Sequence, residues 1–276
     1  MNAIDQIVLT ALSDIPSVGP GDDITTIVVT ALERTSIVLE PGDVIVITHK
    51  IVSKAEDRYV DLEEIIPSEY ARCLADEVGK DPRLVEVILS ESNEVVRKNK
   101  GILVTEHRLG FVVANAGVDS SNIDHIEGNS RVLLLPTDPD KSCSEIQNRI
   151  QTDTGVCVGI IINDSHGRAW RNGTVGLALG SSGIPALLDL RGRPDIFGVD
   201  LKTTQVGLAD EIAAAASLLM GQGNEMRPVV HVRGVPYPLS EGKASDLLRS
   251  KQEDLFPVSY THLRAHETDS YLVCRL

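Results

Sequence analysis

The sequence predicts a mixed α/β fold, with mixed sheets arranged in two lobes. Runs of β-branched and aliphatic residues at 43–48 and 158–162 are typical of buried strands. The alanine-rich segment 209–220 favours a helix. Apolar runs at 101–105 and 110–114, separated by a short turn, predict a β-hairpin. Because a hairpin pairs antiparallel strands, a purely parallel sheet is not expected.

Length and composition limit the classes of protein that the chain can belong to. Its 276 residues can bury a sizeable core, and its net charge of −14 excludes the basic surface that nucleic acid or an anionic membrane requires. No apolar run is long enough for a membrane span, and the first residues do not resemble a signal peptide. The four cysteines lack the spacing of a zinc site. The chain is therefore expected to be cytoplasmic.

The amino-terminal part is predicted to alternate strands with helices. A strand is expected over 4–12, and Asp23 could cap the helix that follows a turn-rich segment. The strand at 43–48 leads into a segment with Lys50 and Lys54, which share one face if that segment is helical. In so acidic a chain the two lysines could bind phosphate, or they could be solvated side chains.

The middle of the chain is expected to hold helices over 67–78 and 81–90, to which no chemistry is assigned. The second hairpin strand then leads to Asp119. A strand over 131–135 and a helix over 140–150 complete this part.

The central stretch, 158–173, carries the clearest candidate chemistry. Its apolar strand is predicted to end at Asn163, so that Asp164 and Ser165 lie at the carboxyl end with Arg168 and Arg171 beyond them. Carboxylate and hydroxyl oxygens are ligands that Mg²⁺ and Mn²⁺ prefer. Asp119 and Asp164 could thus share a divalent cation. The alternative is two unrelated acids that cap turns, with solvated arginines.

The last third shows no standard nucleotide motif. The glycine-rich run 173–183 lacks the GxGxxG spacing, and GxxxxGK[ST] is absent from the sequence. The helix over 209–220 is followed by a polar loop that could be a nucleotide lid or only a cap. A strand over 228–232 comes next.

Together these segments resemble the coenzyme F420-0:L-glutamate ligase family. The matching motifs follow the family's order over most of residues 1–245. They are HKIVSKAE (49–56), GFVVANAGVDSSN (110–122), IIINDSHGRAWRNG (160–173), DLRGRPDIFG (189–198) and ADEIAAAASLLMGQG (209–223).

The resemblance implies a homodimeric, GTP-dependent ligase whose substrates are coenzyme F420-0 and L-glutamate. It implies two divalent cations, Mg²⁺ or Mn²⁺, with K⁺ as a further candidate. By family position Asp119 and Asp164 would bind the first cation, and Ser165 and Gln222 the second. The residues that would hold GTP are Ile15, Pro16, Ser17, Val18, His49, Lys50, Lys54, Asn122, Met220, Gly221, Gln222, Gly223, Asn224, Glu225, Met226 and Arg227.

Two positions depart from the family's pattern. Ser165 stands where the family usually has Thr, and its hydroxyl is retained. Gln222 stands where the family often has Glu, so the second cation would bind more weakly or would use Glu225.

The implied mechanism activates the cofactor's carboxylate as an acyl phosphate before glutamate attacks. Lys54, Arg168 and Arg171 are the candidate catalytic residues. His166 is a candidate, by position only, for the base that deprotonates the amine, but it is expected to be a surface histidine. Two alternatives use the same residues: a metal-dependent phosphohydrolase, and a homologue that binds nucleotide or cofactor without catalysis.

The carboxyl-terminal end is expected not to belong to the fold. Residues 1–245 would form the ligase domain and 246–256 its end. Residues 257–276 are expected to be a non-native tail, because 258–268, VSYTHLRAHET, resemble a translated sequencing adapter. A native chain could continue instead into the flavin-dependent, nitroreductase-like domain of some relatives.

Overall fold

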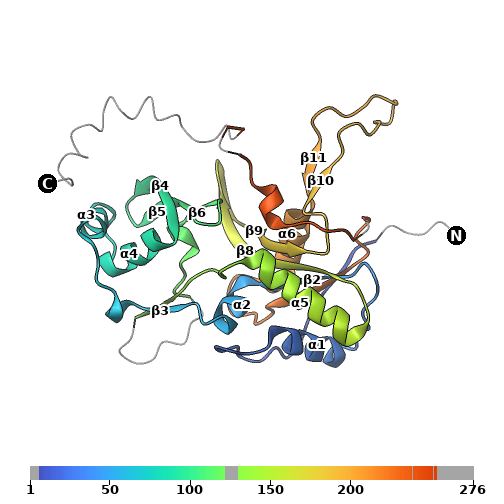
Figure 1. The fold of residues 1–276 in the computed structure, drawn as a ribbon, viewed down its shortest axis with the longest axis horizontal. Helices are drawn as coiled ribbons and strands as arrows, with labels where there is room; N and C mark the ends of the chain where they lie inside the picture. Colours follow the sequence, from blue (N-terminus) through green and yellow to red (C-terminus); the bar gives the residue numbers. More distant parts are fainter. Residues whose placement is uncertain (1–5, 122–129, 238, 251, 254–276) are drawn as a thin grey trace. The chain divides into compact units, whose positions relative to one another are not determined.

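A computed structural model describes residues 6–121, 130–237, 239–250 and 252–253 (Figure 1). Asn122 and residues 257–276 lie outside the described residues. The chain divides into two compact units, one of Met1–Arg58 with Leu135–Leu247 and one of Tyr59–Leu134 with Leu248–Leu276. Helices and mixed sheets occur together, which confirms the mixed α/β class. In the described part of the chain, no helix is both long and apolar enough to cross a membrane.

The first unit is built on a five-stranded sheet in the order β1-β12-β2-β8-β9. Only β2 and β8 are parallel, with Val44 opposite Gly159, and the other neighbouring strands are antiparallel. The strands are β1 (Val8–Ala11), β12 (Val229–Arg233), β2 (Val44–Thr48), β8 (Gly159–Arg168) and β9 (Arg171–Ser182).

Four helices pack around this sheet. They are α1 (Ile24–Arg34), α2 (His49–Ala55), α5 (Pro139–Thr154) and α6 (Leu208–Met220). Asp23 accepts a hydrogen bond from the backbone nitrogen of Thr26, which confirms the predicted cap of α1. The alanines of α6 pack against Val44, Val46 and Ile161, so small side chains bring this helix close to the sheet.

A buried ionic cluster ties β12 to the start of β2. The carboxylate of Asp43 is 1% exposed and accepts a bidentate pair from Arg233, at 2.8 and 2.7 Å. Nε2 of His231 lies 2.9 Å from the same carboxylate, and the backbone nitrogen of Glu40 donates to it. The cluster therefore lies at the edge of the sheet where β2 begins.

The predicted end of the central strand at Asn163 is wrong. Strand β8 continues to Arg168 and forms a hairpin with β9, which the glycine-rich run supplies. The register shifts between Ile162 and Asn163, where β9 contains an extra residue. Polar residues favour a turn locally, but pairing with β9 supplies their backbone hydrogen bonds, so tertiary context overrides the local preference.

The second unit contains the predicted helix pair and hairpin. Helix α3 (Glu69–Val78) ends at the left-handed Gly79, and α4 (Pro82–Ser90) is capped by Asp81. The three-stranded sheet has the order β4 (Ser92–Asn99), β5 (Ile102–His107) and β6 (Val112–Ala114). The hairpin β5–β6 is confirmed, whereas β4, which is rich in charged residues, was not predicted.

The remaining elements are short. The second unit also pairs β3 (Tyr59–Asp61) with β7 (Arg131–Leu133), and the first pairs β10 (Leu187–Asp189) with β11 (Gln205–Gly207). The 3₁₀ helices of the described residues are η1 (Leu62–Glu64), η2 (Asn115–Gly117) and η3 (Ala244–Leu247).

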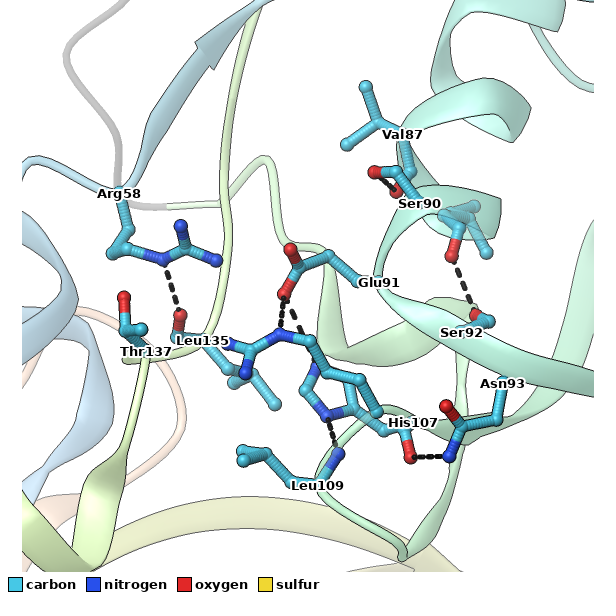
Figure 2. Close-up of polar contacts among 12 residues, drawn as sticks. Arg58, Val87, Ser90, Glu91, Ser92, Asn93, His107, Leu109, Leu135 and Thr137 are labelled. Atoms are coloured by element: carbon cyan, nitrogen blue, oxygen red, sulfur yellow. Dashed lines mark hydrogen bonds and ion pairs between the residues drawn. The ribbon is translucent and has the colours of Figure 1, made fainter.

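A buried polar network in the second unit holds the β5–β6 turn (Figure 2). Oε2 of Glu91 lies 3.0 Å from Nε of Arg108 and 3.5 Å from Nε2 of His107. Nδ1 of His107 accepts from the backbone nitrogen of Leu109, and its ring stacks on Phe111 at 5.0 Å. These charged and aromatic contacts therefore stabilise the β5–β6 turn, which precedes Asp119 in the chain.

Candidate active site

Several predicted segments meet at one edge of the five-stranded sheet. Because β1 and β2 are each antiparallel to β12, they run in the same direction, as does β8. The residues after β1, after β2 and before β12 therefore lie at the same edge. The backbone nitrogen of Thr48 donates to the oxygen of Pro228 at 2.8 Å, which places the end of the 220–227 loop beside α2. Ligands of open α/β sheets bind at the carboxyl ends of parallel strands.

Asp164 is the centre of the polar contacts at this edge. Its Oδ1 lies 3.2 Å from Nε2 of His49, the first residue of α2, and its Oδ2 lies 3.0 Å from Nε2 of His166. The backbone nitrogen of Ser165 also donates to Oδ1 at 2.7 Å. The carboxylate is thus held from two elements of the first unit.

This environment keeps Asp164 ionised. Burial acts to raise the pKa of Asp164, but the electrostatic interaction with His49 and hydrogen bonds from His166 and His49 outweigh it. The pKa of Asp164 therefore lies well below its ordinary value. A permanent carboxylate suits a cation ligand better than a general acid, which must hold a proton at neutral pH.

The expectation that His166 is a surface residue is wrong. Its side chain is buried at 5% exposure because β8 continues past the predicted break and alternation brings residues 164 and 166 to one face. His49 is equally buried, and among the described residues no hydrogen-bond partner reaches its Nδ1. Sequence reasoning assigned His49 to the nucleotide and missed its contact with Asp164. Residues 163–166 are all polar, so the local pattern gave no signal that the strand continues through them.

The predicted lysine pair lies on α2, directly after the strand end. Lys50 and Lys54 are half-buried and one helical turn apart, as the sequence predicted. Since His49 begins the same helix, one segment carries both the partner of Asp164 and the two lysines.

The other predicted nucleotide segments lie in loops of the same unit. Ile15 and Val18 are buried and anchor the turn after β1, while Pro16 and Ser17 between them are exposed. The 220–227 loop begins at Gly221, whose φ is +73°. The carboxylate of Glu225 folds back to accept from the backbone nitrogen of Gly223 at 2.8 Å, and Gln222 is exposed. Glu225, the alternative cation ligand, therefore supports its own loop.

Asp119 belongs to the second unit, so its proposed sharing of a cation with Asp164 stays a prediction. It pairs with Leu133 through both backbone groups, and its Oδ1 accepts from the backbone nitrogen of Ser121 at 2.7 Å. The preceding Asn115, Ala116 and Gly117 all have positive φ, an unusual conformation for the first two. Strained backbone of this kind is common next to functional residues.

The two predicted arginines flank the tip of the β8–β9 hairpin. Arg168 and Arg171 are opposite each other in register, and both side chains are exposed. Their contact with substrate stays a prediction.

The donor set at the edge fits a hard divalent cation. In the described residues, no three His, Cys, Asp or Glu side chains are grouped as metal ligands. Asp164 offers an ionised carboxylate on one face of β8, whereas Ser165, on the other face, and Gln222 offer neutral oxygen donors. Magnesium sites commonly use one or two carboxylates and take their remaining ligands from water and substrate phosphates. A cation here would therefore depend on a bound phosphate group.

The fold and site define a mixed α/β protein with an anionic, oxygen-rich site at the carboxyl edge of its main sheet. The model of the F420-0:gamma-glutamyl ligase family matches residues 13–234, and the chain belongs to this family.

Three relatives illustrate the similarity, and each is named coenzyme F420:L-glutamate ligase. The protein of Methanothermobacter thermautotrophicus is 45% identical over 252 residues, which are 91% of this chain and 98% of that protein. The protein of Methanopyrus kandleri is 46% identical over 243 residues, 87% of this chain and 93% of its own. The protein of Methanocaldococcus jannaschii is 47% identical over 218 residues, 79% of this chain and 86% of its own.

Proposed function

We propose that the protein is a GTP-dependent ligase that adds L-glutamate, through γ-linkages, to coenzyme F420-0 in coenzyme F420 biosynthesis. The observation that carries the proposal is the family match over residues 13–234. The ionised Asp164 at the edge where the matched loops meet supports it.

The chemistry requires an activated carboxylate, because a carboxylate at neutral pH does not accept an amine. An oxygen of the acceptor's carboxylate attacks the γ-phosphorus of GTP, and the bond from that phosphorus to the β-phosphate oxygen breaks to release GDP. The α-amine of glutamate then attacks the acyl carbon, phosphate leaves, and the amine loses a proton. Catalysis of the first step is chiefly positioning and charge neutralisation.

The residues of the site would divide these tasks. Asp164 and Asp119 would hold one cation, and Ser165 and Gln222 the second. Bound cations would neutralise charge that develops on the transferred phosphoryl group. His49 and His166 would orient Asp164, as the partners of metal ligands commonly do.

Cationic side chains would hold the substrates. Lys50 and Lys54, carried by α2, would contact the GTP phosphates, together with the 15–18 turn, Asn122 and the 220–227 loop. Arg168 and Arg171 would grip substrate carboxylates or phosphates, because a guanidinium can donate two parallel hydrogen bonds to such a group.

The protein would assemble as a two-lobed homodimer and act in the cytoplasm. Two lobes are expected from the pattern of strands and helices, a homodimer from the family resemblance, and a cytoplasmic location from the composition.

The test is mass spectrometry of F420-0 after incubation with the protein, GTP, Mn²⁺ and L-glutamate. Mass gains of one glutamate residue each, with GDP released, are expected. GDP without a glutamylated product would indicate a phosphohydrolase. Binding of nucleotide or cofactor without any product would indicate a non-catalytic homologue.

A further inference from the structure

We infer that Asn163 is a positioning residue that sets the distance between Ser165 and the 220–227 loop. The inference rests on the proposed function, in which Ser165 and Gln222 hold one cation and the loop holds the nucleotide. Asn163 lies two residues before Ser165 on β8, and it contacts Met220, two residues before Gln222.

The amide of Asn163 is buried against α6. Its side chain is 3% exposed, and Nδ2 lies 3.0 Å from Oγ of Ser217 and 3.2 Å from Sδ of Met220. Ser217 donates its own hydroxyl proton to the oxygen of Ala213 at 3.0 Å, so it must accept from Asn163. In this arrangement the Nδ2 end of the amide faces the helix, and among the described residues no hydrogen-bond partner reaches its buried Oδ1.

Strand alternation puts Asn163 and Ser165 on the same side of the sheet. Ile161 packs in the core that α6 covers, and side chains at 161, 163 and 165 point to the same face. The register shift leaves this alternation intact, because the extra residue lies in β9. Ser165 therefore faces the side of α6, whereas Asp164 faces His49 on the other side.

Gly176 makes the close approach of α6 possible. It is the partner of Ser165 in the β8–β9 register. A Cβ atom at this position would lie 2.1 Å from Oγ of Ser217, 2.6 Å from the oxygen of Ala213 and 2.7 Å from Oδ1 of Asn163. Only a residue without a side chain lets the helix, the amide and the strand meet here.

The contacts of the Asn163 amide with Ser217 and Met220, called here the Asn163 bridge, have a role beyond packing because of where they lie. Met220 is the last residue of α6, and the 220–227 loop begins there with Gly221 at positive φ. The contact of its Sδ with Nδ2 of Asn163 joins the end of α6 to β8, the strand that carries Ser165. Loss of the bridge would let the loop move relative to Ser165, since the rest of the loop is exposed.

The test compares two variants that each remove a side-chain amide while keeping side-chain size: Asn163 is buried and Gln147 is half-buried. Asn163→Leu removes the bridge at the carboxyl edge. The control, Gln147→Met, removes a similar bridge at the other edge, where Gln147 accepts from Ser182 and donates to the oxygen of Val158. Urea unfolding would establish how much stability each variant loses.

The main readout is calorimetric binding of GDP in the presence of Mn²⁺. Asn163→Leu is expected to raise the dissociation constant about 10- to 100-fold, the range seen when residues that orient metal ligands are changed. Gln147→Met is expected to leave this constant within about 2-fold of the native value. Gly176→Ala is expected to act like Asn163→Leu, because it pushes α6 away while the amide remains.

The outcomes separate this inference from the proposed function. Native protein that binds GDP with Mn²⁺ and glutamylates F420-0, with Asn163→Leu unchanged in binding, would overturn the positioning role alone. An equal loss of binding in Gln147→Met would do the same, because the effect would then follow general stability. Native protein that binds neither nucleotide nor Mn²⁺ would overturn both.

Discussion

Nε2 of His49 lies 3.2 Å from Oδ1 of Asp164, although the two residues are far apart in the sequence. The contact follows from the parallel pairing of β2 and β8, in which Thr48 is opposite Asn163. The residue after each of these positions therefore comes to the same edge. Helix α2 begins at His49, and Asp164 lies in the β8 strand of the β8–β9 hairpin. Both side chains are therefore held on rigid elements.

Removing the charge of Asp164 should strongly weaken cation binding in the site. We expect Asp164→Asn to weaken Mn²⁺ binding by about 100-fold or more, because an amide offers a neutral oxygen in place of a carboxylate. Titration calorimetry with GDP present would measure this. The exposed Asp153→Asn serves as a control, and equal Mn²⁺ affinity in the two variants would exclude Asp164 as a ligand.

His166 should act through Asp164. We expect His166→Gln to raise the Mn²⁺ dissociation constant about 10- to 100-fold, since a metal ligand that loses its hydrogen-bonded partner is less well oriented. His231→Gln is a matched control, because it also removes a buried histidine paired with an aspartate, at the opposite edge. That variant should lose stability and keep its affinity for Mn²⁺. Weakened Mn²⁺ binding in His231→Gln, with native affinity in His166→Gln, would contradict a role of His166 in orienting Asp164.

Gln222 should limit the strength of the second cation site. We expect Gln222→Glu to lower the Mn²⁺ concentration for half-maximal ligase activity about 10-fold, because it adds a charged ligand in an exposed loop. Gln151→Glu adds the same charge to the exposed end of α5 and should have no effect. A Gln222→Glu enzyme with an unchanged Mn²⁺ requirement would remove this residue from the ligand set.

Arg171 should contribute to substrate binding. We expect Arg171→Ala to raise KM for F420-0 or for glutamate about 10-fold, the effect of losing a hydrogen bond to a charged group. Steady-state kinetics with each substrate varied in turn would identify which one it contacts. Arg149→Ala, on exposed α5, is the control. Unchanged kinetics in Arg171→Ala would eliminate the proposed grip.

The buried cluster around Asp43 should make stability depend on acid pH. Burial acts to raise the pKa of Asp43, but hydrogen bonds from Arg233, the Glu40 backbone and His231 outweigh it, so its pKa is lowered in the folded protein. The stabilisation is therefore complete above the unfolded-state pKa of about 3.9 and is lost as pH falls through the lower, folded-state pKa.

Asp43→Asn should remove that dependence and destabilise the protein at neutral pH. We expect a loss of about 2 kcal/mol at pH 7, because the variant replaces charged hydrogen bonds to the half-buried Arg233 and the buried His231 with neutral ones. Urea unfolding between pH 7 and pH 3 would measure both effects. Asp153→Asn, which breaks an exposed pair, should cost less than about 1 kcal/mol. A native-like slope with pH in Asp43→Asn would assign the acid sensitivity to other carboxylates.

Local sequence patterns predicted much of the fold because they act over a few residues. Asp23 caps α1, the helices expected over 67–78 and 81–90 form α3 and α4, and the apolar runs form β2 and the start of β8. The resemblance likewise supplied the family, which the comparison over residues 13–234 confirms. The candidate site residues Asp164, Lys50 and Lys54 were predicted because they follow these apolar runs in the sequence.

Tertiary structure alone decided how the side chains of the site meet. The sequence determined that Asp164 follows an apolar strand, but it predicted a turn there, because Asn, Asp, Ser and Gly favour turns locally. Pairing with β9 keeps the segment extended, which buries His166 beside Asp164 and turns Asn163 towards α6. The physical reason is that strand pairing and helix packing join residues distant in the chain, and no local preference encodes those partners.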